Sequence, residues 1–172
     1  TALARRQRFL FCIPFISRFQ DLAAAAAALA TDNPEDFNWA VSFDPDFIAE
    51  LMYHGFLTMA DRVATDKYVL LPKLHRVRSV LDLAHLQVSK TARRLAKGFR
   101  LSMDADFARV CDRIVQQHGE NWFYKPLVAA FTAMNARGSR GCADGRVFLH
   151  SFELWAGGGV SDGEPQLVAG EG

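Results

Sequence analysis

Four cations recur at helical spacing near the middle of the chain: Lys90, Arg93, Arg94 and Lys97. Their i, i+3, i+4 and i+7 positions place them on one face of a helix that starts near Ser89. Like charges stacked in this way repel one another, and no Glu or Asp stands among or beside them to relieve the repulsion. A polyanion would relieve it, and a phosphate backbone is the commonest such partner. A solvated helix face that only aids solubility is the alternative interpretation.

The positive charge of the chain is concentrated around this stripe. The segment from Lys73 to Arg100 holds eight Lys or Arg and one acid, a net charge of +7, whereas the whole chain has a formal net charge of +1. Because the remainder is therefore negative, the sequence predicts a local positive field that steers anions to one place. The residues expected to bury the opposite face of the helix are Val88, Ala92, Leu95 and Ala96.

The composition predicts one globular domain. At 172 residues and 50% hydrophobic content, the chain is long enough to form a core. The sequence contains no run of about 18 apolar residues, so no membrane span is predicted. The Arg-rich start precedes an apolar run, Phe9 to Ile13, which we interpret as a lead into a first strand and not as a targeting peptide, because Pro14 interrupts it. Three widely spaced cysteines and no His pair at ligand spacing indicate a reducing, cytoplasmic compartment and predict neither a metal nor a cofactor.

Local signals divide the chain into an N-terminal lead, residues 1–43, and a second region, residues 44–172. In the lead, the alanine run at residues 23–28 favours helix but has no apolar face, so we expect a poorly packed insertion. In the second region, Asp44 and Pro45 open a helix that ends at Gly55. Residues 68–71 form a short strand that Pro72 stops.

Beyond the cationic helix, the pattern alternates between strands and helices. Residues 99–103 alternate as a strand, and Asp104 is expected to cap a helix whose apolar stripe includes Cys111 and which ends at Gly119. Pro126 opens another helix, which Gly138 closes. Strands are predicted at residues 146–155 and from residue 167, where the chain ends inside the strand. The fold class is therefore α/β or α+β.

Five stretches occur in the order in which the leucyl/phenylalanyl-tRNA–protein transferases have similar ones, and the chain resembles that family. They are residues 88–94, 104–110, 121–123, 150–155 (His-Ser-x-Glu-x-Trp) and 167–170, and residues 46–56 resemble the helix before the family's Gly-Ile-Phe-Pro-Trp motif. The resemblance implies an acetyltransferase-like mixed sheet flanked by helices. It implies a cytoplasmic monomer that moves Leu, Phe or Met from aminoacyl-tRNA to the N-terminal amine of an acceptor protein, a modification linked to protein degradation.

The resemblance also assigns candidate site residues. The cations that it assigns to the tRNA acceptor stem are Lys90, Arg93, Arg94 and Lys97. Trp122 matches the family's active-site Trp, with a core tryptophan as the alternative. Glu153 is the other catalytic candidate. His150 faces away from Ser151 and Glu153 on the expected strand, so the three form no single-face triad, and a structural use of His150 is favoured.

The sequence departs from the family at two places. Thr58 and Met59 stand where the family has Pro and Trp. The family's Gly-Glu-Ser segment and its later Asp-x-Gln pair organise the reaction centre, and both are expected beyond Gly172. Glu171 matches no catalytic position of the family. We therefore expect a fragment, incomplete at its C-terminus, that binds tRNA without transferring the amino acid.

Two alternative functions stay open. An acyl-coenzyme-A-dependent N-acyltransferase needs a Gly-rich loop that opens a helix and cradles pyrophosphate. Gly157 to Gly159 lack that spacing and a following helix, so we expect a hairpin turn there. The other alternative is a non-catalytic RNA-binding module that uses the cationic helix alone.

Overall fold

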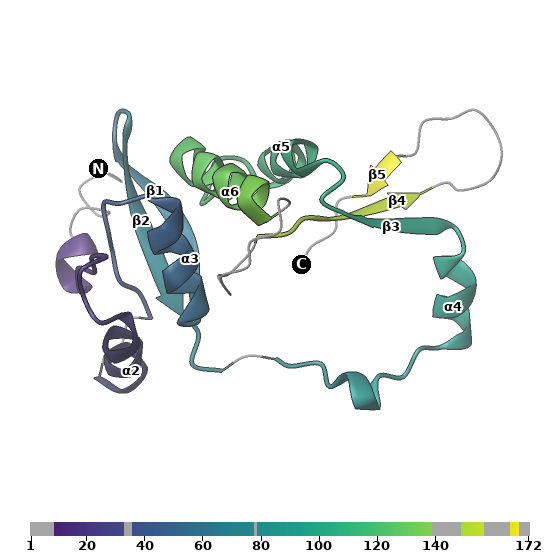
Figure 1. Cartoon of the computed structure of the whole chain (residues 1–172), viewed down its shortest axis with the longest axis horizontal. Helices are drawn as coiled ribbons and strands as arrows, with labels where there is room; N and C mark the ends of the chain where they lie inside the picture. The colour runs from purple at the N-terminus through teal and green to yellow at the C-terminus, as the bar shows by residue number, and fades with distance from the viewer. Residues whose placement is uncertain (1–8, 33–35, 78, 139–148, 157–165, 169–172) are drawn as a thin grey trace.

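The computed structural model describes residues 9–32, 36–77, 79–138, 149–156 and 166–168. Its elements are α2 (Leu22–Asp32), α3 (Pro45–Tyr53), β1 (Phe56–Ala64), β2 (Lys67–Leu74), the 3₁₀ turn η1 (Leu83–His85), α4 (Lys90–Ala96), β3 (Phe99–Met103), α5 (Phe107–His118), α6 (Lys125–Gly138), β4 (Phe152–Ala156) and β5 (Gln166–Val168) (Figure 1). The mixed α+β class is confirmed. The strands form two antiparallel sheets, β1–β2 and β3–β4–β5, so the acetyltransferase-like mixed sheet stays a prediction.

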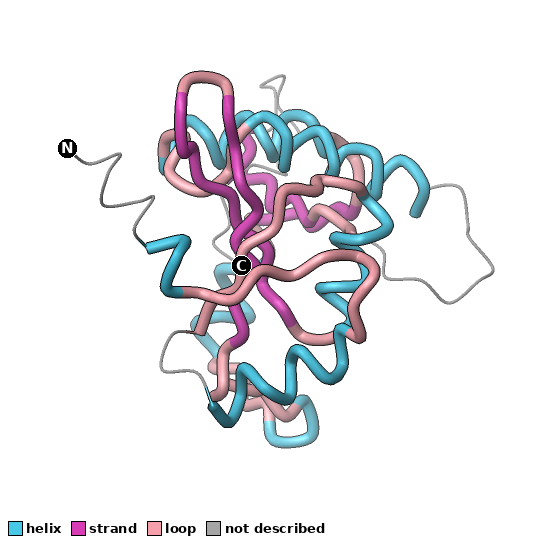
Figure 2. Tube along the Cα trace, turned by 90° about the vertical axis from the view of Figure 1, so that its left-hand side faces the viewer, coloured by secondary structure: helices cyan, strands magenta, loops and turns pink. Residues whose placement is uncertain are grey.

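Helix α3 and the β1–β2 hairpin form as their local signals predict. The Asp44 carboxylate accepts hydrogen bonds from the amides of Asp46 and Phe47, at 2.9 and 3.1 Å, which satisfies two of the free N–H groups of the first turn. Gly55 has φ +88°, a conformation that favours glycine, and it turns the chain directly into β1. The buried face of α3 packs against β1 and α6. The turn end of the hairpin projects from the rest of the molecule in both views (Figure 1, Figure 2).

Strand β2 does not stop at Pro72, contrary to the prediction, but continues to Leu74. Its other edge pairs with residues 36–40: Ala40 and Leu70 exchange two backbone hydrogen bonds of 2.8 Å, and the Asn38 amide donates to the Pro72 carbonyl at 2.9 Å. Because alternate residues of a strand bond to opposite neighbours, the missing N–H of Pro72 falls on this outer side. The β1–β2 ladder is therefore not interrupted.

The expected strand at Phe9 to Ile13 is wrong, because residues 9–12 are helical and pairing starts only with the bridge between Phe15 and Trp39. An apolar run this short does not distinguish a strand from a helix. The expectation of a poorly packed Ala-rich insertion is also wrong. Leu22 and Leu29, seven residues apart and therefore on one face of α2, are both buried in the main core.

Helices α5 and α6 confirm the predicted pair on either side of Gly119, where φ is +69°. The N-cap of α5 is Asp106 and not Asp104, since Asp106 accepts from the Arg109 amide at 3.1 Å. Cys111 is buried as predicted, and this burial, together with the neighbouring Asp112, raises the pKa of its thiol to about 11. Leu127 of α6 has no exposed surface and belongs to the same core cluster.

A long, open connection leads from β2 to α4 (Figure 1). All its described residues from 75 onward are exposed, and exposure continues through α4 into β3. The prediction that Val88 and Leu95 bury one face of the cationic helix is therefore wrong, because they are 42% and 58% exposed. Among the residues that the structure describes, no helix is both long and apolar enough to cross a membrane.

Candidate nucleic-acid interface and the polar network behind it

Helix α4 places the four cations as their spacing predicts. Ser89 caps the helix, its hydroxyl accepting from the Ala92 amide at 3.1 Å, and the helix continues to a C-cap at Lys97 with helical dihedrals. The four side chains are exposed, and none of them forms an ion pair with a described residue. Their mutual repulsion is thus unrelieved within the described part of the chain. We call Lys90, Arg93, Arg94, Lys97 and the following Arg100 the cationic surface.

The other cations of the basic segment are used elsewhere. Arg76 pairs with Asp36 at 3.3 Å, and Lys73 lies 5.1 Å from the centre of the Phe37 ring. These contacts attach the end of β2 to residues 36–37, and Arg78 lies outside the described residues. The cationic surface therefore begins at α4, not at Lys73.

At the end of β3 that leads into α5, the strands β3 and β4 and the start of α5 enclose a network of carboxylates. Glu153 on β4 is fully buried. Its Oε2 accepts from the Ser102 hydroxyl at 2.6 Å and the Ala105 amide at 3.2 Å, and its Oε1 accepts from the Ser151 hydroxyl at 2.5 Å and the Asp106 amide at 3.4 Å. Burial opposes ionisation of Glu153, but these four donors outweigh burial and lower its pKa.

Asp104 is the second carboxylate of the network. Its Oδ1 accepts from Asn135 Nδ2 at 2.7 Å and from the Ser151 amide at 2.8 Å, and its Oδ2 accepts from His150 Nδ1 at 2.5 Å. Burial raises the pKa of Asp104, but the donors outweigh it and the net shift is downward. Asp104 has φ +53°, an unusual conformation for a residue with a side chain, which the surrounding hydrogen bonds hold in place.

The network reaches the cationic surface through Trp155. The Trp155 indole donates to the Ser102 hydroxyl at 2.7 Å. The guanidinium carbons of Arg100 and Arg109 lie 6.0 and 5.4 Å from the centre of the indole ring, at the range of a cation–π contact. The carboxylates therefore position the residue on which Arg100 packs.

The structure separates the two catalytic candidates. Glu153 lies inside the network, with its carboxylate shielded from solvent. Trp122 lies in the loop between α5 and α6, packs against the main core, and accepts a backbone hydrogen bond from the Ala60 amide at 2.9 Å. This environment favours the core-tryptophan alternative. His150 and Ser151 diverge as predicted, since His150 binds Asp104 while Ser151 binds Glu153.

The two positions that depart from the family motif lie on β1. Thr58 is 2% exposed, and its hydroxyl is buried without a hydrogen-bond partner. It stands opposite Pro72 in the ladder. Gly157 to Gly159 and Glu171 lie outside the described residues, but β5 pairs antiparallel with β4, in agreement with the predicted reversal of the chain between them.

Three members of the network, Ser102, Asp104 and Asn135, were not predicted as site residues. The sequence pattern predicted only a helix cap for Asp104. Asn135 is 8% exposed and lies next to the buried Met134. An amide at a core position needs partners there, so its place in an apolar helix was the available signal. Within the described ranges, no three His, Cys, Asp or Glu side chains lie close enough together to hold a metal ion.

Comparison with protein-family models, with curated proteins and with solved structures finds no match to this chain.

Acidification should destabilise the protein through the two network carboxylates. Both have a pKa that is lower in the folded chain than their ordinary values of 3.8 for Asp104 and 4.5 for Glu153. Their contribution is thus fully present above those values and is lost as the pH falls below them. The midpoint of urea unfolding, measured from pH 7 to pH 3, should fall below about pH 4.5. Asp104→Asn should flatten this decrease while the exposed-residue control Glu120→Gln leaves it unchanged; equal profiles for Asp104→Asn and the wild type would contradict the assignment.

Proposed function

We propose that this chain provides the tRNA-binding part of an aminoacyl-tRNA–protein transferase. The observation that carries the proposal is the cationic surface: an exposed helix with four cations on one face and no described carboxylate paired with them. A phosphate backbone is the partner that turns this repulsion into binding energy, because each contacted phosphate releases condensed counterions. The order of motifs shared with the leucyl/phenylalanyl-tRNA–protein transferases selects tRNA among polyanions.

In the proposed reaction, the free α-amine of an acceptor protein attacks the ester carbonyl of aminoacyl-tRNA. The new amide bond forms as the ester bond breaks, the tRNA leaves with its 3′ hydroxyl, and the amine loses a proton. The ester is already activated, so the protein has to position the amine, hold the apolar side chain and stabilise the developing oxyanion. We assign none of these steps to a residue of this chain, and we place the protein in the cytoplasm as a monomer.

We propose a positioning role for Glu153 and Asp104. Glu153 connects β3, β4 and the start of α5 through Ser102, Ser151 and two backbone amides. Because Ser102 in turn holds the Trp155 indole, the carboxylate acts on the cationic surface through Trp155 and Arg100. This arrangement supports a role in holding the tRNA-binding strand and helix in register.

The second candidate is a non-catalytic RNA-binding module. One observation favours it: Trp122, which matches the active-site tryptophan of the transferase family, packs against the core. Such a module needs the cationic surface alone and has no pocket for an amino acid.

Affinity for charged and uncharged tRNA should separate the two functions. A transferase buries the Leu or Phe side chain of its substrate, so Leu-tRNA and Phe-tRNA should bind about 10-fold or more tightly than the same tRNAs after deacylation. Equal affinities would favour the RNA-binding module. Failure to bind either form at 0.1 M salt would contradict both proposals. Fluorescence anisotropy of labelled tRNA, with a non-hydrolysable 3′-amide linkage to the amino acid, is the appropriate measurement.

A further inference from the structure

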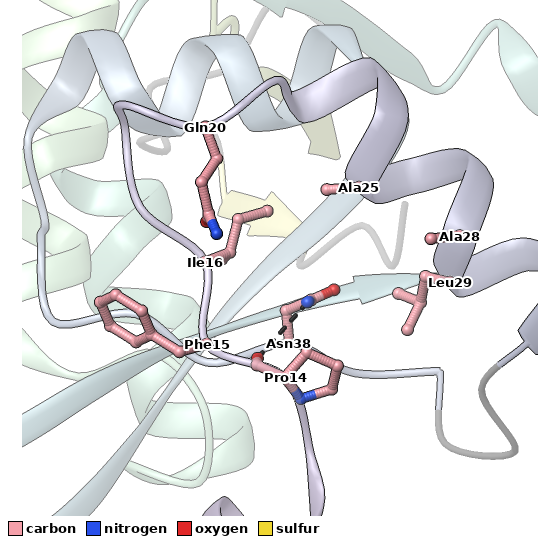
Figure 3. A pocket seen from close by; sticks show the side chains of 8 residues that line it. All are labelled: Pro14, Phe15, Ile16, Gln20, Ala25, Ala28, Leu29 and Asn38. Carbon is pink, nitrogen blue, oxygen red and sulfur yellow. Dashed lines mark hydrogen bonds between the residues drawn. The ribbon is translucent and has the colours of Figure 1, made fainter.

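A cavity of about 370 Å³ is lined by α2 and by the segment that precedes it (Figure 3). Helices α2 and α4 lie at opposite ends of the molecule, so this cavity is remote from the cationic surface (Figure 1). Apolar side chains dominate its lining, among them Phe15, Ile16, Ala25 and Leu29. Its volume falls within the range of about 300–1,000 Å³ typical of small-molecule sites. None of the described residues that line it is charged.

Asn38 is the one buried polar side chain among the described residues of the lining. It is 4% exposed, and its Nδ2 donates a hydrogen bond of 3.4 Å to the Pro14 carbonyl. Its Oδ1 is buried and has no hydrogen-bond partner. If the Asn38 amide were flipped, its Oδ1 would face the Pro14 carbonyl, and two acceptors would then be in contact. The unpaired atom of the amide is therefore the oxygen, an acceptor. Figure 3 shows the oxygen pointing from the Pro14 side toward Leu29 of α2.

Gln20 provides the other polar side chain among the described lining residues. Gln20 Oε1 accepts from the Ser17 amide at 2.7 Å. Among the described residues of the lining, Asn38 Oδ1 is the one buried side-chain atom without a hydrogen-bond partner. An apolar molecule with a single donor satisfies both the acceptor and the apolar walls. Because Asn38 Oδ1 is buried, the side chain has to rotate for such a molecule to reach it, and the one hydrogen bond that this breaks is long, at 3.4 Å.

We propose that this cavity binds a small, neutral, largely apolar molecule that donates one N–H or O–H hydrogen bond to Asn38 Oδ1. Because none of the described lining residues is charged, a neutral ligand fits the cavity better than an ion or a zwitterion, whose charge would have no partner among them. The proposal concerns a different part of the molecule from the proposed tRNA-binding surface, so its test is independent of the test of the proposed function.

Indole and benzofuran test this inference as a matched pair, because they share shape and differ in the N–H donor. Indole should bind, and benzofuran should bind about 5- to 10-fold more weakly, the difference expected for one hydrogen bond to a buried acceptor. The Trp39 resonances in an NMR titration provide the readout, since the Trp39 ring packs against Phe15 at 4.8 Å. No binding of indole, or equal binding of the two probes, would overturn the proposal.

Variants locate the site. Ala28 lines the cavity yet is exposed, so Ala28→Phe should fill the cavity and abolish indole binding without disturbing the core. Ala27→Phe, one residue away on the exposed surface of α2 and outside the lining, is the control and should bind indole normally. Asn38→Leu should make the affinities for indole and benzofuran equal. Unchanged indole binding in Ala28→Phe would show that indole binds elsewhere and would refute the site.

Discussion

Replacing both Arg93 and Arg94 with glutamate should weaken tRNA binding by about 10²-fold at 0.1 M salt. Each phosphate contact contributes roughly one unit to the slope of log Kd against log salt concentration, so the slope should fall by about two. The two side chains lie in the last turn of α4, exposed and without an ion-pair partner among the described residues, so the exchange disturbs no folded-state contact that the structure shows. A salt series of anisotropy titrations measures both quantities.

The matched control makes the same change in charge on another surface. Arg113 and Lys125 are exposed on α5 and α6, and replacing both with glutamate alters the net charge of the chain equally. This control should retain most of the affinity and nearly the full slope, since long-range effects are screened beyond about 10 Å at 0.1 M salt. If the α4 variant keeps the wild-type affinity and slope, the stripe is only a solvated helix face.

Sequence patterns predicted the elements whose causes are local. The helix that begins at Asp44 and ends before Gly55 depends on a cap, a proline at the first position and a glycine at the end, all of which act within a few residues. The cationic face of α4 likewise depends on spacing alone. The mixed α+β class followed from the alternation of such local elements.

The errors occurred where a distant segment decides the structure. Strand β2 continues past Pro72 because residues 36–40, more than thirty positions earlier, bond to the Pro72 carbonyl and the Leu74 amide, and neither bond needs the missing N–H. The Ala-rich segment is a core helix because Leu22 and Leu29 find partners in the main core. Nothing in either local sequence indicates those partners. The prediction for α4 was wrong in the opposite direction, because Val88 and Leu95 were expected to be buried and are exposed.

The polar network shows the same limit within the candidate site. Glu153 was recognisable from its motif, but its partner Ser102 lies 51 residues away, and Asn135 lies 31 residues from Asp104. The pattern of Asp104 and Asp106 offered two possible helix caps, and local sequence favoured the wrong one. Asp104 instead uses its unusual backbone conformation to direct its carboxylate to the segment that enters β4.

Replacing Glu153 with alanine should lower the free energy of unfolding by about 3–5 kcal/mol, because the change removes the acceptor from four donors and opens a cavity in a fully buried place. This is a large share of the roughly 5–15 kcal/mol that stabilises a typical domain. Urea unfolding followed by circular dichroism measures the loss.

Glu153→Gln separates the charge of this side chain from its shape. The amide keeps one oxygen acceptor and the side-chain volume, but its NH₂ group must face a hydroxyl or backbone N–H that also donates, so the expected loss is about 1–3 kcal/mol. Glu50→Ala, which removes an exposed carboxylate from α3, is the control and should change stability by less than about 0.5 kcal/mol. If Glu153→Gln folds and binds tRNA less tightly than Glu50→Ala does, the buried carboxylate acts on the cationic surface through Ser102 and Trp155 as proposed. If Glu153→Ala is as stable as the wild type, the network does not hold β3 and β4 to the start of α5, and the positioning role fails with it.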